Sequence, residues 1–195
     1  KNSSNLNNCY AKNNLGIIFR NGIQVQKNLT WSIEYFTEAI KIDNNDFVLS
    51  YNLAHILFFE EKTVDLDKLI QLLIHSANRK LICAFELLCL IVYNEFGYSQ
   101  DGRKKFKEKY DSESWESLAN DVFNYINIEI NNSSAYEYLY EKIKNTQLIY
   151  IYYDGYIFPI IENEKLRDEL YFDKLYSNIE KKMINEEFYE GFGCI

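Results

Sequence analysis

The sequence predicts a mainly α-helical fold, in which a short α/α-repeat solenoid is followed by a C-terminal extension that contains a small β-hairpin. The first observation behind this prediction is a motif that occurs twice and begins a third time, with Leu15, Leu53 and Leu88 in equivalent places. These leucines are 38 and then 35 residues apart, and periods of that size are typical of stacked helix pairs. The second observation is the scarcity of glycine (7) and proline (1), because a β-sandwich needs many more turn residues.

Apolar residues recur every three or four positions in the first half of the chain, as a buried helix face requires. Five such stripes predict five helices, and they contain Leu15, Ile18 and Phe19; Leu29, Ile33, Phe36 and Ile40; Leu49, Leu53, Ile56 and Leu57; Leu66, Leu69, Ile70, Leu73 and Ala77; and Phe85, Leu88, Cys89 and Val92. We expect residues 1–8 to form a frayed start or a cap, and Thr30 to be the N-cap of the second helix.

The second half of the chain begins after a predicted loop at residues 97–102. A long helix is expected to start at residue 111 or 112 and to bury Trp115, Leu118, Ala119, Val122 and Ile126. A shorter helix follows from Ser134, which forms a capping-box pattern with Glu137, and runs to about residue 144. A last helix is expected from residue 163 to about residue 184.

The segment Gln147–Ile161 is rich in β-branched and aromatic residues, and Asp154 and Gly155 lie in its middle. Asp-Gly between two such runs is a strong signal for a β-hairpin, because the turn requires positive φ. Pro159 lacks an N–H donor, so its strand is expected to be an edge strand at that point. The alternative interpretation is a buried helix that ends at Gly155. Together the elements predict helical repeats at residues 11–97 and an extension at residues 103–195, packed on the repeats as one unit.

The first copy of the repeat carries the pattern Ala-x-x-x-Leu-Gly, then a further glycine, then Tyr-Phe-x-x-Ala in its second helix. This pattern resembles the Sel-one-like repeat, a relative of the tetratricopeptide repeat, and the matching residues are Ala11, Leu15, Gly16, Gly22, Tyr35, Phe36 and Ala39 in the first copy and Leu53, Ala54, Leu72, Leu73, Ser76 and Ala77 in the second. Small residues such as Gly16 and Ala39 allow two helices to cross closely. The resemblance covers about residues 11–97 and implies a protein-binding α-solenoid without cofactors or catalytic residues.

The composition argues against several kinds of site. The four cysteines (Cys9, Cys83, Cys89 and Cys194) form no Cys-x-x-Cys pair, so we expect free thiols in a reducing compartment and no metal site. His55 and His75 are interpreted as surface or inter-repeat residues.

The longest apolar stretch is far too short to span a bilayer, and we expect a soluble, cytoplasmic protein that binds no membrane. The basic run at residues 103–107 is interpreted as a solvated helix face, and the net charge of −8 opposes nucleic-acid binding.

The net charge is concentrated in one segment. Residues 111–164 contain ten acids but only two lysines, which gives this segment a net charge of −8. Acidic groups interleaved with aromatic side chains are suited to a basic protein partner, because the charges speed the encounter and the aromatics anchor it. The alternative is a solvated acidic face around a tyrosine-rich core. The predicted partner-binding residues are Glu113, Glu116, Asp121, Glu129, Glu137, Tyr138, Glu141, Asp154, Tyr156, Glu162 and Glu164.

These observations predict a protein-binding function without catalysis. The small, acidic chain, rich in asparagine, lysine, isoleucine and tyrosine, is similar to the immunity proteins of bacterial contact-dependent growth inhibition systems. That similarity implies a partner such as the basic nuclease domain of a toxin, whose active site the carboxylates would block. The alternative hypothesis is a solenoid adaptor that assembles other proteins. A second candidate site is the inner surface of the solenoid around Tyr35, His55 and His75.

Overall fold

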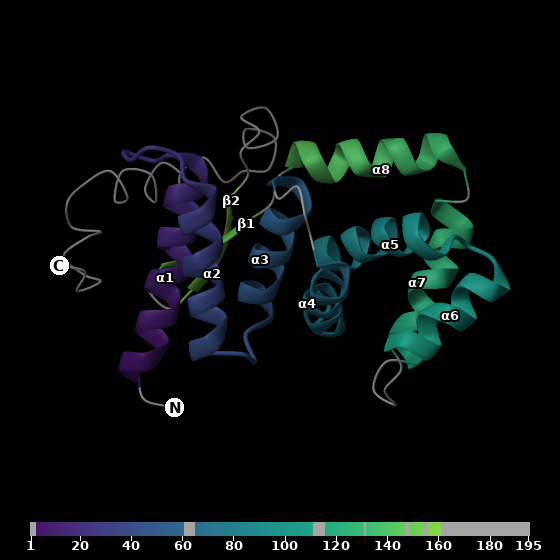
Figure 1. The fold of residues 1–195 in the computed structure, drawn as a ribbon, viewed down its shortest axis with the longest axis horizontal. Coiled ribbons are helices and arrows are strands. Elements are labelled where there is room, and N and C mark those ends of the chain that lie inside the picture. Colours follow the sequence, from purple (N-terminus) through teal and green to yellow (C-terminus); the bar gives the residue numbers. More distant parts are fainter. Residues whose placement is uncertain are drawn as a thin grey trace. The chain divides into compact units, whose positions relative to one another are not determined.

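The computed structural model describes the backbone of residues 3–60, 65–110, 116–130, 132–146, 149–153 and 156–160 (Figure 1). The mainly α-helical fold with a small hairpin is confirmed. The elements in chain order are α1 (Ser3–Asn21), α2 (Leu29–Ile42), α3 (Phe47–Glu60), α4 (Leu66–Asn78), α5 (Ile82–Phe96), α6 (Gln100–Tyr110), α7 (Glu116–Glu129), α8 (Ser133–Thr146), β1 (Ile149–Tyr153) and β2 (Tyr156–Ile160).

The chain forms two compact units. The first unit combines Lys1–Lys62 with Thr146–Ile195, and the second unit is Thr63–Asn145. This division differs from the predicted boundary between residues 97 and 103, which falls inside the second unit, because α5 and α6 pack against each other there. It also places α3 and α4, predicted as the two helices of the second repeat copy, in different units.

In the first unit, α1 and α2 cross closely at Gly16. A Cβ atom added to Gly16 would lie only 2.8 Å from the ring of Phe36, which is completely buried. The hydroxyl group of Ser32 donates a hydrogen bond of 2.6 Å to the Gly16 carbonyl oxygen, so the two backbones are held near each other. The close crossing predicted from the small side chain at this position is therefore confirmed.

The starts of the first two helices differ from the predicted ones. Because α1 already begins at Ser3, most of the predicted lead-in is helical. The N-cap of α2 is Asn28 rather than Thr30, which lies inside the first turn. Asn28 has an extended backbone, and its side-chain oxygen accepts a hydrogen bond of 3.1 Å from the Trp31 N–H.

The hairpin predicted in the segment 147–161 is confirmed. β1 and β2 pair in antiparallel orientation with Tyr153 opposite Tyr156, which makes the alternative of a helix ending at Gly155 wrong. Pro159 is opposite Tyr150 in the sheet of two described strands. Proline lacks an N–H donor, and in this position no further described strand depends on one. β1 packs against α1 and α3, and every α3 side chain from residue 48 to residue 57 is buried.

In the second unit, the turn between α5 and α6 depends on two glycines. Gly97 ends α5 with a φ of 67°, which favours glycine. Gly102 lies inside α6, and a Cβ atom there would be 1.9 Å from the carbonyl oxygen of Phe96. The close approach brings the ring of Phe106 to 5.4 Å from that of Phe96, measured between centroids, and Phe106 also contacts Phe123 of α7 at 5.8 Å. These rings connect three helices.

No single helix among the described residues is long and apolar enough to cross a membrane. Among the described residues, one pair of consecutive helices, α5 and α6, is long and apolar enough when taken together, but the two helices are bent by 113° relative to each other.

We predict that Gly102→Ala destabilises the second unit. Alanine has a helix propensity about 1 kcal/mol better than glycine, but overpacking costs typically about 1–3 kcal/mol. Here the added methyl group meets a backbone carbonyl, which cannot rotate away as a side chain can. We therefore expect the overpacking cost to exceed the propensity gain, with a net loss of up to about 2 kcal/mol in the free energy of unfolding, measured by urea denaturation. The control is Lys104→Ala on an exposed position of α6, and an equal effect of both changes would contradict the prediction.

Candidate protein-binding surface

The structure places five of the eleven predicted partner-binding side chains, and all five are exposed in the second unit: Asp121 and Glu129 on α7, and Glu137, Tyr138 and Glu141 on α8. Glu116 and Tyr156 begin α7 and β2, and only their backbone is described. Tyr156 belongs to the first unit, apart from the others in the contact network. The remaining four, Glu113, Asp154, Glu162 and Glu164, lie outside the described residues.

The exposed acids of α7 follow from its helical pattern. Asp121, Tyr125 and Glu129 are spaced at four residues, which aligns them along one side of the helix. Ile128 lies three residues after Tyr125 and belongs to the same side. The opposite side is buried and contains Val122, Phe123, Ile126 and Ile130. The α7 surface thus combines two carboxylates, a phenol and an apolar side chain.

Helix α8 is fixed to the second unit by its buried side and by one ion pair. Leu139 and Ile143 are buried, and Lys142 reaches Glu86 of α5 at 2.7 Å. The N-cap is Asn132, whose side-chain oxygen accepts the Ala135 N–H at 2.9 Å. The predicted cap at residue 134 is therefore wrong, since the helix starts earlier.

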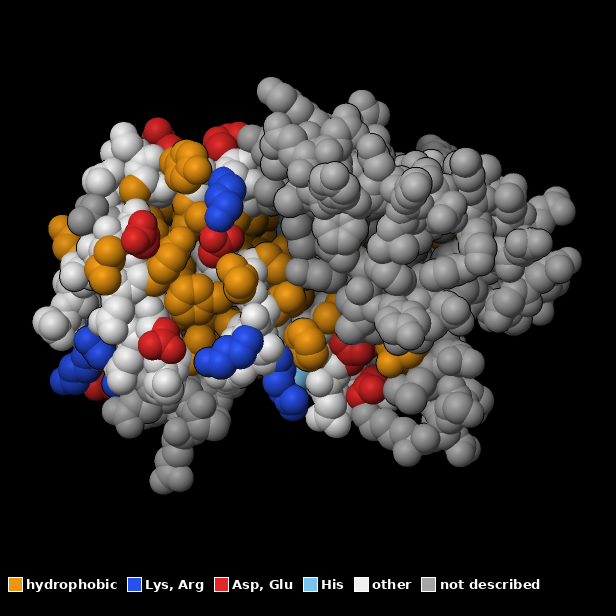
Figure 2. Space-filling view, turned by 180° about the vertical axis from the view of Figure 1, so that it is seen from behind, with side chains coloured by type: hydrophobic (Ala, Val, Ile, Leu, Met, Phe, Trp, Pro, Cys, Tyr) orange, Lys and Arg blue, Asp and Glu red, His pale blue; other side chains and the backbone are white. Residues whose placement is uncertain are grey.

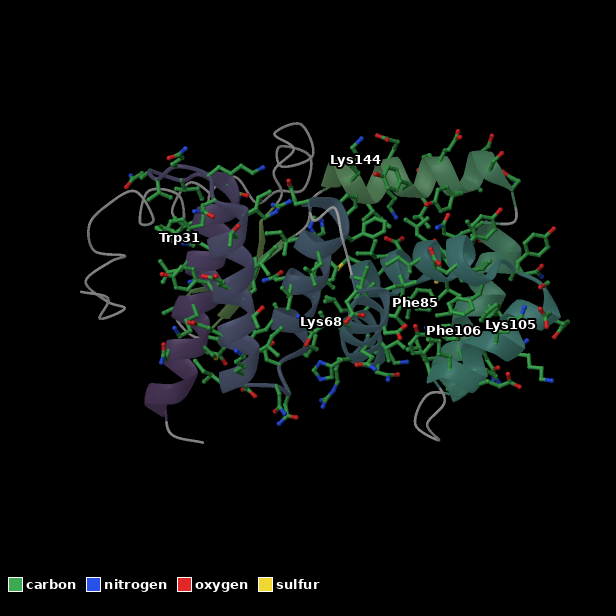
Figure 3. The ribbon with its side chains drawn as sticks, in the orientation of Figure 1. Trp31, Lys68, Phe85, Lys105, Phe106 and Lys144 are labelled. Atoms are coloured by element: carbon green, nitrogen blue, oxygen red, sulfur yellow. The ribbon has the colours of Figure 1, made fainter. Side chains whose placement is uncertain are left out.

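Tyrosine rings lie next to one another between α5 and α8. Tyr93 of α5 is stacked with Tyr136 of α8 at a centroid distance of 5.6 Å, and Tyr136 is followed by Tyr140 at 6.4 Å. The row ends at Lys144, whose ammonium group is 5.7 Å from the Tyr140 ring and which is labelled in Figure 3. Tyr98 extends the row from the other side. In the sequence, Tyr136 and Tyr140 belong only to the aromatic-rich acidic segment, and no local signal indicates their proximity to Tyr93 and Tyr98, which are distant along the chain.

The charges of this surface are not neutralised equally. Within the described part of the chain, Asp121, Glu129 and Glu137 form no ion pair with any lysine, arginine or histidine. In contrast, the lysines of α6 and α8 that would offset them are engaged with other acids; such pairs are Lys104 with Glu108, Lys105 with Asp101, Lys109 with Asp67, and Lys144 with Glu141. Three exposed carboxylates therefore keep their charge available for a partner.

The phenol of Tyr125 experiences this negative field. Burial, together with the nearby charges of Glu86 and Glu129, raises the pKa of Tyr125 to about 12. The phenol consequently stays protonated at physiological pH and is a hydrogen-bond donor as well as an acceptor. Seen from behind, the coloured part of Figure 2 shows orange hydrophobic side chains with red carboxylates and blue Lys and Arg side chains among them.

No group of three or more histidine, cysteine or acidic side chains among the described residues is arranged to hold a metal ion. Cys9 and Cys89 are buried and Cys83 is half-buried, and burial raises the pKa of Cys89 far above its ordinary value, which keeps this thiol protonated. Cys194 lies outside the described residues.

The second candidate site contains a histidine that is not at the surface. His55 is completely buried among the rings of Tyr51 and Phe59, so the surface alternative of its predicted setting is wrong, while the inter-repeat alternative stays a prediction. Within the described part of the chain, neither of its ring nitrogens has a hydrogen-bond partner. Burial lowers its pKa to about 3, and the charge of Arg20 acts in the same direction. His55 is thus a neutral residue in the core of the first unit.

The other two residues of that site lie in different surroundings. Tyr35 is half-buried and stacks on Phe19 with centroids 5.5 Å apart. His75 is half-buried on α4 in the second unit. Polar contacts between α1 and α3 are formed instead by Asn52, which donates a hydrogen bond of 2.8 Å to Asn13.

Comparison of the chain with protein-family models, with curated proteins and with solved structures finds no match in any of the three. The resemblance of residues 11–97 to Sel-one-like repeats therefore stays a prediction.

We predict that His55 makes the fold sensitive to mild acid. Its pKa in the folded protein is lowered below the value of 6.5 expected in the unfolded chain, so its contribution is fully present above pH 6.5 and is lost progressively toward pH 3. This predicts a loss of about 1.4 kcal/mol in the free energy of unfolding between pH 7.5 and pH 5.5, since one pKa unit corresponds to about 1.4 kcal/mol.

The measurement is urea denaturation of the wild-type protein and of His55→Leu at both pH values. Leucine removes the titrating group, so the difference in stability between the two proteins should change with pH by the predicted amount. A pH-independent difference would show that His55 is not responsible for acid sensitivity.

Proposed function

We propose that this chain is a cytoplasmic, non-catalytic protein-binding module that acts as an immunity protein and neutralises a basic, nuclease-type toxin domain. The observation that carries the proposal is a set of three exposed carboxylates, Asp121 and Glu129 on α7 and Glu137 on α8, that form no ion pair within the described residues. Helix α8 also carries the ring of Tyr138, which is 73% exposed. A nuclease binds phosphate groups through lysine and arginine side chains. Carboxylates on the inhibitor would occupy these cationic positions in place of the nucleic acid.

The physical roles of acids and aromatics at such a surface differ. Unpaired charges attract an oppositely charged partner over roughly 8 Å at physiological salt, and they mainly increase the rate of association. Tyrosine side chains combine a large apolar area with a hydroxyl group, and they frequently contribute most of the binding energy in protein interfaces. A surface with both features supports a basic protein partner better than a nucleic acid, which the negative charge would repel.

A solenoid adaptor is the second candidate function. It is supported by the close crossing of α1 and α2 at Gly16, which is the geometry that paired repeat helices require. The two functions differ in the surface that binds. An adaptor would use the repeat helices of residues 11–97, whereas an inhibitor would use α7 and α8.

We predict that reversing the three unpaired acids weakens binding without unfolding the protein. The variant is Asp121→Lys, Glu129→Lys and Glu137→Lys together, and exposed charges contribute only about 0–1 kcal/mol each to stability. The wild-type protein is used to capture its partner from a lysate of the native host, and mass spectrometry identifies the partner. We expect a basic protein. Its association rate with the chain should fall as salt is raised from 50 to 300 mM, because salt screens the charges that steer the encounter.

The control has the same change in net charge on other helices: Glu34→Lys, Glu38→Lys and Glu95→Lys, all at exposed positions. The control should bind the purified partner as the wild type does, and the partner should lose its nuclease activity when the wild-type chain is added. An acidic partner, or equal binding by both triple variants, would exclude the proposed surface.

A further inference from the structure

Two isoleucines of the second unit are largely exposed. Ile82 at the start of α5 is 72% exposed, and Ile128 near the end of α7 is 69% exposed. Single exposed apolar residues are common on protein surfaces, but clusters of them mark interaction sites. The two isoleucines are therefore informative only if other apolar side chains connect them.

Phe85 and Tyr125 provide this connection. Phe85 lies three residues after Ile82 on α5, and Tyr125 lies three residues before Ile128 on α7, so each pair shares one side of its helix. The rings of Phe85 and Tyr125 meet edge to face with centroids 5.4 Å apart. We call these four residues the α5–α7 patch; Phe85 is labelled in Figure 3.

Acidic side chains flank the α5–α7 patch on both helices. Asp121 and Glu129 lie one turn before and one turn after Tyr125, and both are exposed and unpaired in the described structure. They are eight residues apart on α7, which corresponds to about 12 Å along the helix. On α5, Glu86 is engaged by Lys142 and is mostly covered. The patch is therefore apolar at its centre and carries its available negative charge along α7.

We propose that the α5–α7 patch binds the apolar side of a basic amphipathic helix of a partner protein. This inference rests on the proposed function and names the element of the basic partner that is recognised. A helix can place two cations two turns apart, about 10–12 Å, with apolar side chains between them, and this spacing matches Asp121 and Glu129 on either side of Tyr125.

The secondary structure of the second unit favours a helix over an extended segment. All of its described elements are helices, so no strand edge is present there to pair with an added strand. An extended partner would leave its N–H and C=O groups without partners in the contact, whereas a helix satisfies its own backbone hydrogen bonds. An apolar patch between helices is the surface against which an amphipathic helix packs.

The test uses three synthetic peptides of 18 residues with a fluorescent label and the full chain. The first contains leucine and lysine in a helical pattern, the second contains the same residues in strict alternation, and the third is the helical pattern with glutamate in place of lysine. Fluorescence anisotropy measures the dissociation constant of each. We expect the helical lysine peptide to bind at least tenfold more tightly than the other two.

The patch variant is Ile82→Ser with Ile128→Ser, and the matched control is Val25→Ser with Trp31→Ser, which removes two exposed apolar side chains of the first unit. Circular dichroism and thermal melting verify that both variants are folded. We expect the patch variant to weaken binding of the helical lysine peptide at least tenfold and the control to change it less than twofold. Equal effects of the two variants, or equal binding of the alternating peptide, would overturn the inference.

The triple acid reversal distinguishes this inference from the proposed function. If the acid reversal abolishes binding of both lysine peptides and the patch variant has no effect, the acidic surface stands and the α5–α7 patch is excluded. If the glutamate peptide binds as well as the helical lysine peptide, the basic character of the partner is excluded together with the inference. If no peptide binds, the inference fails, while the capture experiment still decides the proposed function.

Discussion

The approach of Gly102 to the carbonyl oxygen of Phe96 is the constraint on which the second unit depends. A side chain at residue 102 would push α6 away from the end of α5. The approach allows Phe106 to contact Phe96 on one side and Phe123 of α7 on the other. Because α7 is positioned by this aromatic contact, one side of it is buried and the side with the acids faces outward. The orientation of the candidate binding surface on α7 thus depends on how α5, α6 and α7 pack against one another.

The sequence was sufficient for those elements whose signal is local. Apolar stripes predicted α1 to α5 and α7, and Asp154-Gly155 between two β-rich runs predicted the hairpin that β1 and β2 form. No stripe predicted α6, which begins at Gln100 inside the predicted loop at residues 97–102. Helix starts were less predictable, since Asn28 and Thr30 are both acceptable caps and only the backbone conformation decides between them. The division into two units was not predictable either, because it depends on which helices pack together and not on the length of the repeat.

The candidate site shows the same limit. Exposed acids such as Asp121 and Glu129 were predicted from their density in the sequence, since a carboxylate without a partner stays in water wherever its helix lies. Ile82 gave no such signal, because an isoleucine at the start of an apolar helix is expected to be buried. For His55 the sequence left a surface and an inter-repeat position open, because no local signal distinguishes them, and the ring is enclosed by Tyr51 and Phe59.

The two units differ in how they accommodate polar groups, and this difference supports a division of roles. The first unit buries polar side chains between α1 and α3, including the Asn13–Asn52 pair and the neutral ring of His55, where water and ligands have no access. Buried polar groups contribute to the definition of one packing arrangement and not to encounters with other molecules. The second unit leaves both its unpaired carboxylates and two large isoleucines in water. Burying Ile82 and Ile128 would stabilise the chain, so their exposure is the feature that the proposed partner helix accounts for.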